Sequence, residues 1–478
     1  MTEQIAGTRY TVMGLGVLGG GVGVAQYLAR HGGIVTVTDM RDAADLQTSI
    51  DLLSGLPVTF HLGGHEEADF TRERSDVVVR NPGVRRTNPL LRLARESGVR
   101  VEMEMSLFFR ACRAPVLGVT GTKGKTSVST LCANILRAWN PETILAGNMG
   151  ISALNLVDAI RPDQPVVIEL SSWQLEALDE HGFGPHVAVL TNITPDHLDS
   201  YDSFQHYADT KRTIGLHGGP ESVVVINADD PECEVLEGWA AGRVLKFGLE
   251  DQGTDGAWLS GDTLLLRMDS YEARLPRPEQ LQLSGEHGIR NALAAVAATA
   301  AYGAPVEAIG AGLASFAGVP NRMEEVATID GVLYINDTSA SAPAAAVAGI
   351  RVLGTRAERL TVIAGGADKQ TDLRPFADEL AVRQARVILL DGTGTPELIR
   401  HLQACDVAYK GPFQSMNEAF RVATQDVSSG DIVTLTPGCA SFGLFRNEFE
   451  RGDQFRAEVH ALQASSCVQA YPDQENHQ

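Results

Sequence analysis

Cysteine is scarce in this chain, and the few cysteines form no recognisable motif. None of the six lies in a CxxC pair or at the spacing of metal ligands. They are Cys112, Cys132, Cys233, Cys405, Cys439 and Cys467. In a chain of this size, the pattern predicts free thiols in a reducing compartment and not a disulfide framework.

Long apolar runs are also missing. The first ten residues, MTEQIAGTRY, contain no apolar core of a signal peptide, and no stretch is long enough to cross a bilayer. The Ala-rich stretch from Asn291 to Phe316 is interrupted by Gly303 and Pro305, which predicts packed helices. We therefore expect a cytoplasmic protein without a membrane partner.

Basic residues are too few to balance the acidic ones. The chain has 39 lysines and arginines against 60 aspartates and glutamates, which gives a formal net charge of -21. Duplex nucleic acid and anionic membranes would both be repelled, so neither is expected as a partner. An anionic small substrate is still possible if a few local cations hold it. No internal repeat or association stripe is apparent, and we expect a monomer.

The length of 478 residues, 44 % of them hydrophobic, suffices for about three domains. Recurring β-rich runs with helical patterns between them predict an α/β protein with mostly parallel sheets. We expect a Rossmann-like domain at 1–114, a central P-loop ATPase-like domain at 115–317 and a second Rossmann-like α/β domain at 318–478. Irregular β structure is expected around Ala257 to Leu275, and a helix near His287. The expected strands are Arg9–Met13, Ile34–Thr38, Ser75–Val84, Pro115–Gly121, Pro165–Ser172, His186–Ile193, Ser222–Asp230, Val332–Thr338, Arg359–Gly366, Ala385–Gly392 and Asp431–Gly438.

A glycine turn follows the first expected strand. Gly14, Gly16 and Gly19 form a GxGxxG pattern, and Asp39 ends the next strand about 20 residues later. This is the layout of a dinucleotide-binding βαβ unit. Taken alone it would suggest an NAD-dependent dehydrogenase, but a lone GxGxxG is a weak signal.

The stretch GVTGTKGKTSVST, residues 118–130, predicts a phosphate-binding loop. Gly121 and Gly124 allow backbone N–H groups to approach phosphate oxygens, and the following helix directs its N-terminus at the anion. Lys125 adds a positive charge, and the Thr126 hydroxyl can bind Mg²⁺. The spacing departs from the strict GxxxxGK[ST] form because Val119 is not a glycine. The residues expected to contact ATP here are Gly121, Thr122, Lys123, Gly124, Lys125, Thr126 and Ser127.

Further polar residues follow expected strands. Glu169 ends the run PVVIEL at the edge where open α/β sheets bind ligands, and its carboxylate suits Mg²⁺, although an edge salt bridge is the alternative. His197 could reach the same edge, but a lone histidine is more often structural. Composition alone makes Lys211 an ordinary helix-surface lysine, and it makes Gln174 and Glu176 surface residues. Other candidates at strand ends, helix starts or domain junctions are Asn291, Arg322, Asp337, Ser341, Lys369 and Ser441.

Three domains with polar loops are more than a kinase or a simple NTPase needs. A ligase that joins two substrates through a phosphorylated intermediate does need them. A non-catalytic nucleotide-binding protein is the remaining alternative. The presence of Lys125, Glu169, His197 and Lys211 together argues against it.

Taken in order, the motifs resemble those of the Mur ligases over nearly the whole chain. The matching stretches are GLGVLG, NPGV, GVTGTKGKTS, GNMGIS, IELSSWQLE, NITPDHLDSY, YADTK, SGEHGIRNALA, GVPNRME, INDTSAS, AGGADK and GCASFGLFRNEFERG. IELSSWQLE favours the branch of the family that adds glutamate. A folylpolyglutamate synthase, of the same general fold, would be expected to lack the N-terminal glycine-turn domain.

The resemblance implies an ATP-dependent ligase that adds D-glutamate to UDP-N-acetylmuramoyl-L-alanine through an acyl phosphate. It implies that Val17, Leu18, Asp39, Arg41 and Asn148 bind the UDP-sugar substrate. It places Asn291, Arg322 and Asp337 on ATP, and Ser341, Lys369 and Ser441 at the glutamate. Two Mg²⁺ sites are implied, with Thr126 and Glu169 on one metal. His197 and Lys211 would hold the other, with Lys211 as a carbamate formed with CO₂.

The chain departs from the family pattern at three points. Ser339 stands where the family usually has a lysine, Gly288 where an asparagine is common, and Glu448-Phe449 where the aromatic residue usually precedes the acid. Two of these departures lie in the glutamate-binding domain. They leave L-glutamate, or another amino acid added by a Mur-type ligase, as alternative substrates.

Overall fold

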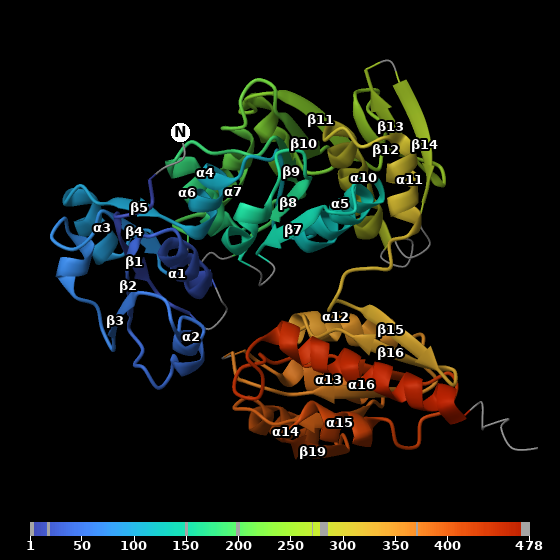
Figure 1. The fold of residues 1–478 in the computed structure, drawn as a ribbon. Helices are drawn as coiled ribbons and strands as arrows, with labels where there is room; N and C mark the ends of the chain where they lie inside the picture. Colours follow the sequence, from blue (N-terminus) through green and yellow to red (C-terminus); the bar gives the residue numbers. More distant parts are fainter. Residues whose placement is uncertain are drawn as a thin grey trace, which may run out of the picture. The chain divides into compact units, whose positions relative to one another are not determined.

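The computed structural model describes residues 4–16, 20–148, 152–196, 201–269, 271–277, 285–369 and 371–469. The chain divides into two compact units, residues 1–316 and residues 317–478. The first unit contains two sheets and the second contains one (Figure 1). The predicted α/β class with mostly parallel sheets is confirmed.

The first sheet of unit 1 has five parallel strands in the order β3-β2-β1-β4-β5. Its order reverses at β1 and β4, so the loops after these strands meet at one carboxyl edge. The strands are β1 (Arg9–Met13), β2 (Ile34–Asp39), β3 (Val58–Leu62), β4 (Val77–Arg80) and β5 (Arg100–Glu102). The helices are α1 (Gly20–Arg30), α2 (Gln47–Asp51), η1 (Glu67–Phe70), α3 (Pro89–Glu96) and α4 (Glu104–Ala111).

The second sheet of unit 1 has nine strands in the order β14-β13-β12-β11-β10-β9-β6-β8-β7. The strands from β7 to β12 in this order are parallel, and β13 and β14 add an antiparallel edge. The strands are β6 (Val116–Thr120), β7 (Ile144–Gly147), β8 (Val166–Glu169), β9 (Val187–Leu190), β10 (Val223–Asn227), β11 (Arg243–Gly248), β12 (Gly256–Ser260), β13 (Thr263–Met268) and β14 (Tyr271–Pro276). The helices are α5 (Lys125–Trp139), η2 (Ala153–Ala159), α6 (Ser172–Glu180), α7 (Phe204–Arg212), η3 (Thr213–Gly215), α8 (Pro231–Glu234), η4 (Val235–Gly238), α10 (Gly285–Ala301) and α11 (Val306–Ala314).

The central strands of this sheet are continuous apolar runs because both faces are covered. Every residue of β6, β8 and β9 is buried, as expected for parallel strands between layers of helices. One cluster of buried apolar side chains continues from the first sheet into the second. The Ala-rich stretch forms α10 and α11, which pack against α5 as the sequence predicts. Within the described part of the chain, no helix combines the length and apolarity needed to span a bilayer.

Unit 2 is a six-stranded sheet in the order β15-β16-β20-β17-β18-β19, with only β15 antiparallel. Two apolar clusters fill it. The strands are β15 (Glu324–Ile329), β16 (Val332–Asn336), β17 (Leu360–Ala364), β18 (Arg386–Leu390), β19 (Tyr409–Phe413) and β20 (Ile432–Leu435). The helices are α12 (Pro343–Leu353), α13 (Arg374–Val382), α14 (Thr395–Ala404), α15 (Met416–Ala423) and α16 (Glu448–Gln469).

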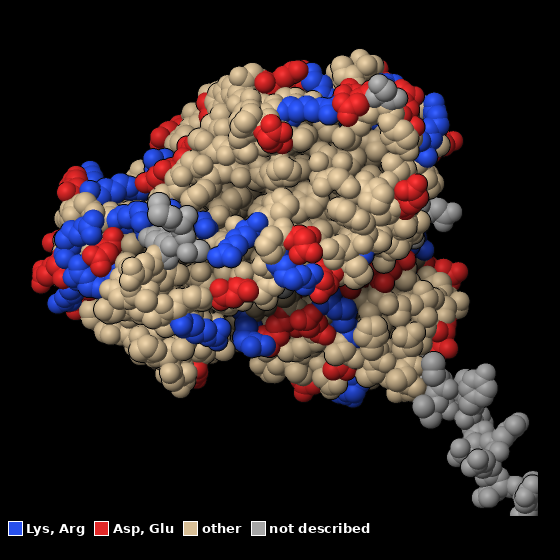
Figure 2. Space-filling view, turned by 45° about the horizontal axis from the view of Figure 1, so that its top comes forward, with Lys and Arg blue, Asp and Glu red and all other residues tan. Residues whose placement is uncertain are grey.

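All eleven expected strands are present, but the sequence misses several others. The unpredicted strands are β3, β5, β7, β11, β15 and β19. Burial along β3 and β19 is partial, with no fully buried residue in either strand, so their sequences lack the apolar run that marks a covered strand. On the face shown in Figure 2, acidic and basic side chains are interspersed with broad uncharged areas.

Gly312 allows α11 to approach α5, the helix that follows the predicted phosphate loop. A Cβ atom at Gly312 would lie 2.4 Å from the Cα of Ile135. We expect Gly312→Ala to lower the free energy of unfolding by about 1–3 kcal/mol because the helices must separate. In Gly310→Ala, on the same helix, the nearest atom to the new Cβ lies at 3.6 Å. That variant should be neutral or gain up to about 1 kcal/mol from helix propensity. Urea unfolding measures both, and equal effects would contradict the packing argument.

Candidate active site

The predicted phosphate loop joins β6 to α5 at the carboxyl edge of the central sheet. Gly121 and Gly124 have φ values of 147° and 84°, in the region that favours glycine. A Cβ atom at Gly121 would lie 1.9 Å from Thr191 Oγ1. Thr122 Oγ1 accepts a hydrogen bond from the backbone N–H of Thr194 at 3.0 Å. The loop is therefore fixed by the segment that follows β9, and its backbone needs glycine at both positions.

Lys125 and Asn291 lie at this loop. The Lys125 ammonium donates to the carbonyls of Gly121 and Thr122, both at 3.0 Å. The Oδ1 atom of Asn291, from α10, lies 2.6 Å from where a Cβ of Gly124 would stand. The structure thus brings Asn291 to the loop from more than 160 residues along the chain. The Lys123 side chain is 75 % exposed and pairs with Asp196 at 3.4 Å. Thr126 and Ser127, in the first turn of α5, are partly buried.

Glu169 is a buried carboxylate beside the loop. It ends β8, pairs in register with Val119 of β6, and is 2 % exposed. Its Oε1 accepts a hydrogen bond from Asn148 Nδ2 at 3.1 Å. Its Oε2 is buried and has no hydrogen-bond partner among the residues described. A buried, unsatisfied carboxylate oxygen is costly, and it suits a hard cation such as Mg²⁺. The oxygen atoms present at this edge thus fit a metal ion. Among the described residues, Glu169 forms a hydrogen bond with Asn148 and not the alternative salt bridge.

Lys211 is not the surface lysine that composition suggests. It lies on the buried face of α7, is 2 % exposed, and its Nζ stands 4.7 Å from the centre of the Tyr207 ring. Tyr207 in turn shares a hydrogen bond of 3.2 Å with Thr122 of the phosphate loop. Burial and the nearby Lys125 lower the pKa of Lys211 to about 7, although Asp196 opposes the shift. The sequence missed this because only the fold shows which face of α7 is covered.

The expectation for Gln174 is also wrong. Gln174 is 7 % exposed because its side chain closes a capping box with Ser171 at the start of α6. Glu176 is partly buried and accepts a hydrogen bond from Arg80 at 3.1 Å. Three predicted site residues, Val17, Leu18 and His197, lie outside the described residues.

At the edge of the first sheet, both carboxylate oxygens of Asp39 accept hydrogen bonds from neighbouring residues. Its Oδ2 accepts from the backbone N–H of Leu15 at 3.0 Å, and Arg41 donates to both oxygens. Burial alone would raise the pKa of Asp39, but the hydrogen bonds from Arg41 outweigh it and the pKa is lowered. The oxygens that would hold a ribose in an NAD enzyme are therefore occupied. This weakens the dehydrogenase hypothesis and leaves Arg41 beside the glycine turn.

Glu104 lies at the same edge and was not singled out in the sequence. It begins α4 and accepts a hydrogen bond at 2.6 Å from Ser152, which directly precedes η2. Burial raises the pKa of Glu104. Its only signal in the sequence is its position directly after a short strand. The contact shows that the edges of the two sheets in unit 1 meet near the start of η2.

In unit 2, three loops interlock at the carboxyl ends of β16, β17 and β20. The Gly438 N–H donates to the Ala340 carbonyl at 2.9 Å, and Ala367 and Ala440 exchange backbone hydrogen bonds. Lys369 Nζ donates to Ser341 Oγ at 2.8 Å. The predicted residues Ser341, Lys369 and Ser441 thus share one edge. The hydroxyl of Ser441 is buried without a partner among the described residues.

Asp337 and Arg322 lie near the same edge but face different surroundings. Asp337 is 4 % exposed and accepts a hydrogen bond from the Met323 N–H at 3.1 Å. Burial raises the pKa of Asp337 to about 7. Arg322 is exposed.

Two further side chains shape this edge. Arg451 of α16 is fully buried and binds the Thr338 hydroxyl at 2.9 Å, its carbonyl at 2.9 Å and the Cys439 carbonyl at 3.2 Å. Burial lowers the pKa of Arg451 to about 10. Ser339, at the position of the family lysine, donates to the Asn321 carbonyl at 2.7 Å. The Ser339 hydroxyl therefore stabilises the loop by this hydrogen bond and does not point to a ligand role.

The depressed pKa of Lys211 predicts a pH-dependent stability. An unfolded lysine keeps its proton up to about pH 10.4, whereas folded Lys211 loses it near pH 7. Between these values the unfolded state binds more protons, so stability rises with pH. In metal-free buffer purged of CO₂, Lys211→Met should exceed the wild type in unfolding free energy by a constant amount below pH 7. That excess should shrink from pH 7 towards pH 10. A difference independent of pH in urea unfolding would contradict the shift.

Comparisons with known proteins cover the whole architecture. Three family descriptions match: the Mur ligase MurD-like N-terminal domain at residues 8–102, the Mur ligase middle domain at 119–299, and the Mur ligase glutamate ligase domain at 321–439. The UDP-N-acetylmuramoylalanine–D-glutamate ligase of Roseiflexus sp. (strain RS-1) is 44 % identical over 96 % of this chain and 100 % of its own length. The enzyme of the same name from Geobacter metallireducens is 35 % identical, over 96 % of this chain and 98 % of the relative.

Solved structures agree on the fold. The UDP-N-acetylmuramate-alanine ligase MurC of Thermotoga maritima gives a TM-score of 0.55 at 20 % identity, over 96 % of this chain and 99 % of that one. The MurF ligase of the same organism, in complex with ADP, gives 0.52 at 16 % identity, over 97 % and 100 %. The chain belongs to the Mur ligase family.

Proposed function

We propose that the protein joins D-glutamate to UDP-N-acetylmuramoyl-L-alanine, with conversion of ATP to ADP and phosphate, in the synthesis of peptidoglycan precursors. The family is one of ATP-dependent, ADP-forming ligases. The substrates are those in the name of the 44 % identical relative. Glu169 is the observation that carries the proposal, because its unsatisfied oxygen lies beside a glycine-rich loop that presents backbone N–H groups. Such an edge is suited to a nucleotide phosphate with a divalent cation.

We assign domains at 1–114, 115–317 and 318–478 to the UDP-sugar, ATP and the amino acid, in that order. Gly121 to Ser127 and Asn291 would bind ATP, with Arg322 and Asp337 brought from unit 2. Val17, Leu18, Asp39, Arg41 and Asn148 would bind the UDP-sugar substrate. Ser341, Lys369 and Ser441 would bind the glutamate carboxylates. The enzyme would act as a cytoplasmic monomer, and the free thiols of the five described cysteines agree with a reducing compartment.

The metal ligands would be Thr126 and Glu169 for one Mg²⁺, and His197 and Lys211 for a second. When bound, these ions would supply neutralisation of the phosphoryl charge. Lys211 would serve as a carbamate, formed when its neutral amine attacks CO₂ and loses a proton. With a pKa of about 7, a large share of Lys211 is neutral near neutral pH, which supports this step. The carbamate would also remove the repulsion between Lys211 and Lys125.

The reaction has two steps. The alanyl carboxylate of the first substrate attacks the γ-phosphorus of ATP, and ADP leaves with the electrons of the broken P–O bond. The acyl phosphate is then attacked by the amine of glutamate, which loses a proton as phosphate departs and the amide forms. Lys125 would offset the charge of the moving phosphoryl group. Lys369 and Ser341 would hold the incoming amino acid by its carboxylates.

The handedness of the amino acid is the first point to measure. Phosphate release from ATP should require both UDP-N-acetylmuramoyl-L-alanine and D-glutamate, and L-glutamate should give at most the background rate. Release with L-glutamate alone would assign the enzyme to the branch that adds L-glutamate. That alternative rests on Ser339, which stands where the family usually has a lysine. Release with neither isomer would call for a screen of other amino acids.

Glu169→Gln should reduce kcat by at least about a hundredfold, because the substitution keeps the shape of the side chain but removes the charge that faces the metal. Glu142→Gln is the matched control, since Glu142 is 60 % exposed and pairs with Arg161 at the surface. It should retain the kcat of the wild type. Steady-state phosphate release at saturating Mg²⁺ measures both, and an active Glu169→Gln enzyme would refute the assignment.

A further inference from the structure

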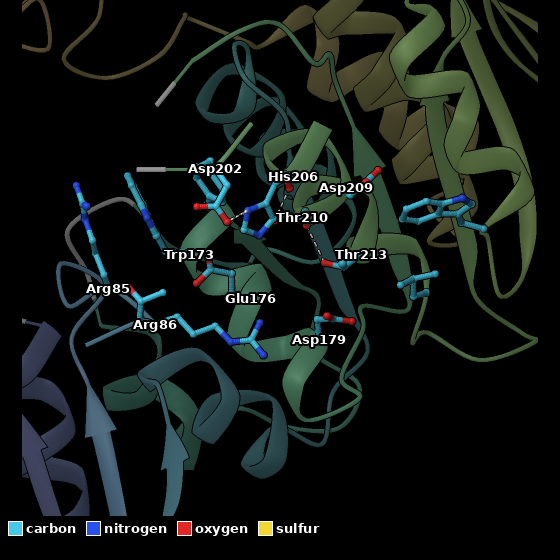
Figure 3. Close-up of a pocket in the computed structure, with 14 residues that line it drawn as sticks. Arg85, Arg86, Trp173, Glu176, Asp179, Asp202, His206, Asp209, Thr210 and Thr213 are labelled. Carbon is cyan, nitrogen blue, oxygen red and sulfur yellow. Dashed lines mark hydrogen bonds and ion pairs between the residues drawn. The ribbon is translucent and has the colours of Figure 1, made fainter. Parts of the chain in front are cut away.

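A cavity lies on unit 1, on the outer faces of α6 and α7. It has a volume of about 500 Å³, and its walls are the loop at 85–87, α6, α7 and the chain beyond it (Figure 3). It contains none of the residues proposed above for ATP, metal or substrates. The lining residues used below are Arg86, Trp173, Glu176, Asp179, Tyr201 and Trp239.

Tyr201 is a buried polar side chain that lines this cavity without a partner. It is 6 % exposed, and its hydroxyl makes no well-formed hydrogen bond with any residue that the structure describes, although Ser172 and Glu176 lie close enough to affect its pKa. Its ring is held edge-on against His206 at 5.3 Å and Tyr207 at 5.2 Å between centroids. Burial, with Glu176 nearby, raises the pKa of Tyr201. An unsatisfied phenol is costly to bury, so a ligand that hydrogen-bonds to it gains affinity.

The wall around Tyr201 is acidic. Glu176 and Asp179 lie three residues apart on one face of α6, Asp202 lies just before α7, and Asp209 lies in the second half of α7. Asp179 pairs with His217 at 2.9 Å and Asp202 with His206 at 3.5 Å. An imidazole offsets a carboxylate only when it is protonated. Glu176 and Asp209 are already paired with arginines, Arg80 at 3.1 Å and Arg212 at 2.7 Å. The negative charge left for a ligand is therefore that of Asp179 and Asp202.

Besides the buried Arg80, which binds Glu176, an exposed cation of the chain approaches this wall. Figure 3 shows the Arg86 side chain reaching into the space between Glu176 and Asp179. Its Nε lies 4.0 Å from Glu180, at the limit of an ion pair, and the side chain is 52 % exposed. A pair so long and so exposed contributes little. The cavity thus has room for the guanidinium of Arg86. Because Arg86 is held weakly, the cation of a ligand could take its place.

Aromatic surface completes the cavity. Trp173 precedes Glu176 by one turn of α6, and Trp239, 37 % exposed, lines the wall further along. Indole faces attract cations and alkyl groups. Four carboxylates line the cavity, and two of them, Glu176 and Asp209, are paired with Arg80 and Arg212. Asp179 and Asp202 are the carboxylates that disfavour an anion here.

We propose that this cavity is a binding site for a small organic cation with an ammonium or guanidinium group on an alkyl body. Its N–H groups donate to the Tyr201 hydroxyl and to the carboxylates of Glu176 and Asp179, and its alkyl body lies on the tryptophans. The site lies on the outer faces of two helices that also belong to the proposed chemistry. The Ser171 cap of α6 follows Glu169 by two residues, and α7 carries Lys211 on its buried face.

Agmatine, which has an ammonium and a guanidinium group on a butyl chain, is the probe. Isothermal titration of the full chain at fixed ionic strength should show one agmatine site. Tyr201→Phe removes only the hydroxyl, and Asp179→Asn removes only a charge. Each should weaken agmatine binding by about tenfold or more, as expected for loss of a charge-assisted hydrogen bond. Tetramethylammonium, which has no N–H group, should bind at least tenfold more weakly than agmatine.

Two matched controls lie away from the cavity. Tyr271→Phe is at a tyrosine that is 53 % exposed, and Asp163→Asn is at an aspartate with a side chain 79 % exposed. Both should bind agmatine as the wild type does. Agmatine should also slow amide hydrogen exchange in α6 and α7. Absence of binding, or equal affinity in both cavity variants and their controls, would overturn the proposal. If Tyr201→Phe fails to fold by circular dichroism, the Asp179→Asn comparison decides alone.

Discussion

The cost of burying charge at the carboxyl edge of the central sheet governs the candidate active site. Glu169 and Lys211 are each 2 % exposed, and burial together with the nearby Lys125 lowers the pKa of Lys211. Without ligands, one carboxylate oxygen has no partner among the described residues and two ammonium groups repel each other. The free-energy cost of burying these charges must be offset by ligand binding, or the surrounding fold must be rigid enough to hold them in place. The site is therefore preorganised. A bound metal would pair with the free carboxylate oxygen, and a bound phosphate would reduce the repulsion between the two ammonium groups.

That rigidity comes from contacts between the two sheets of unit 1. Arg80, 2 % exposed, donates to the Val84 carbonyl at 2.9 Å and to Glu176 of α6 at 3.1 Å. Ser152 donates to Glu104 across the same junction. Arg80 thus ties the turn after β4 to the helix that follows Glu169. The proposed sugar site and phosphoryl site are held in one unit, so alignment of their substrates need not await closure between them.

The sequence predicted what local pattern and order can encode. Apolar runs marked all eleven expected strands, and glycine spacing marked the loop at 118–130, because both depend on neighbours in the chain. The burial of Lys211 could not be predicted, since the same helix pattern would place it in solvent on an uncovered face. The hydrogen bond from Asn148 to Glu169, and the contact of Asn291 with Gly124, join strands and helices far apart in sequence. Resemblance to a family supplied the roles proposed for Asn148 and Asn291, and it did not supply these contacts.

Selection of one enantiomer requires at least three fixed points of contact. At the edge of unit 2 that we propose binds the amino acid, Lys369 alone is a point charge on a flexible stem and cannot supply that constraint. Its hydrogen bond to Ser341 fixes its direction, and the buried Ser441 hydroxyl offers a second fixed group. Ser339 adds none, because it bonds to Asn321. Arg451, bound to Thr338 and Cys439, sets where these loops stand. Handedness should therefore depend on the loop framework that Arg451 holds as much as on the residues that touch the amino acid.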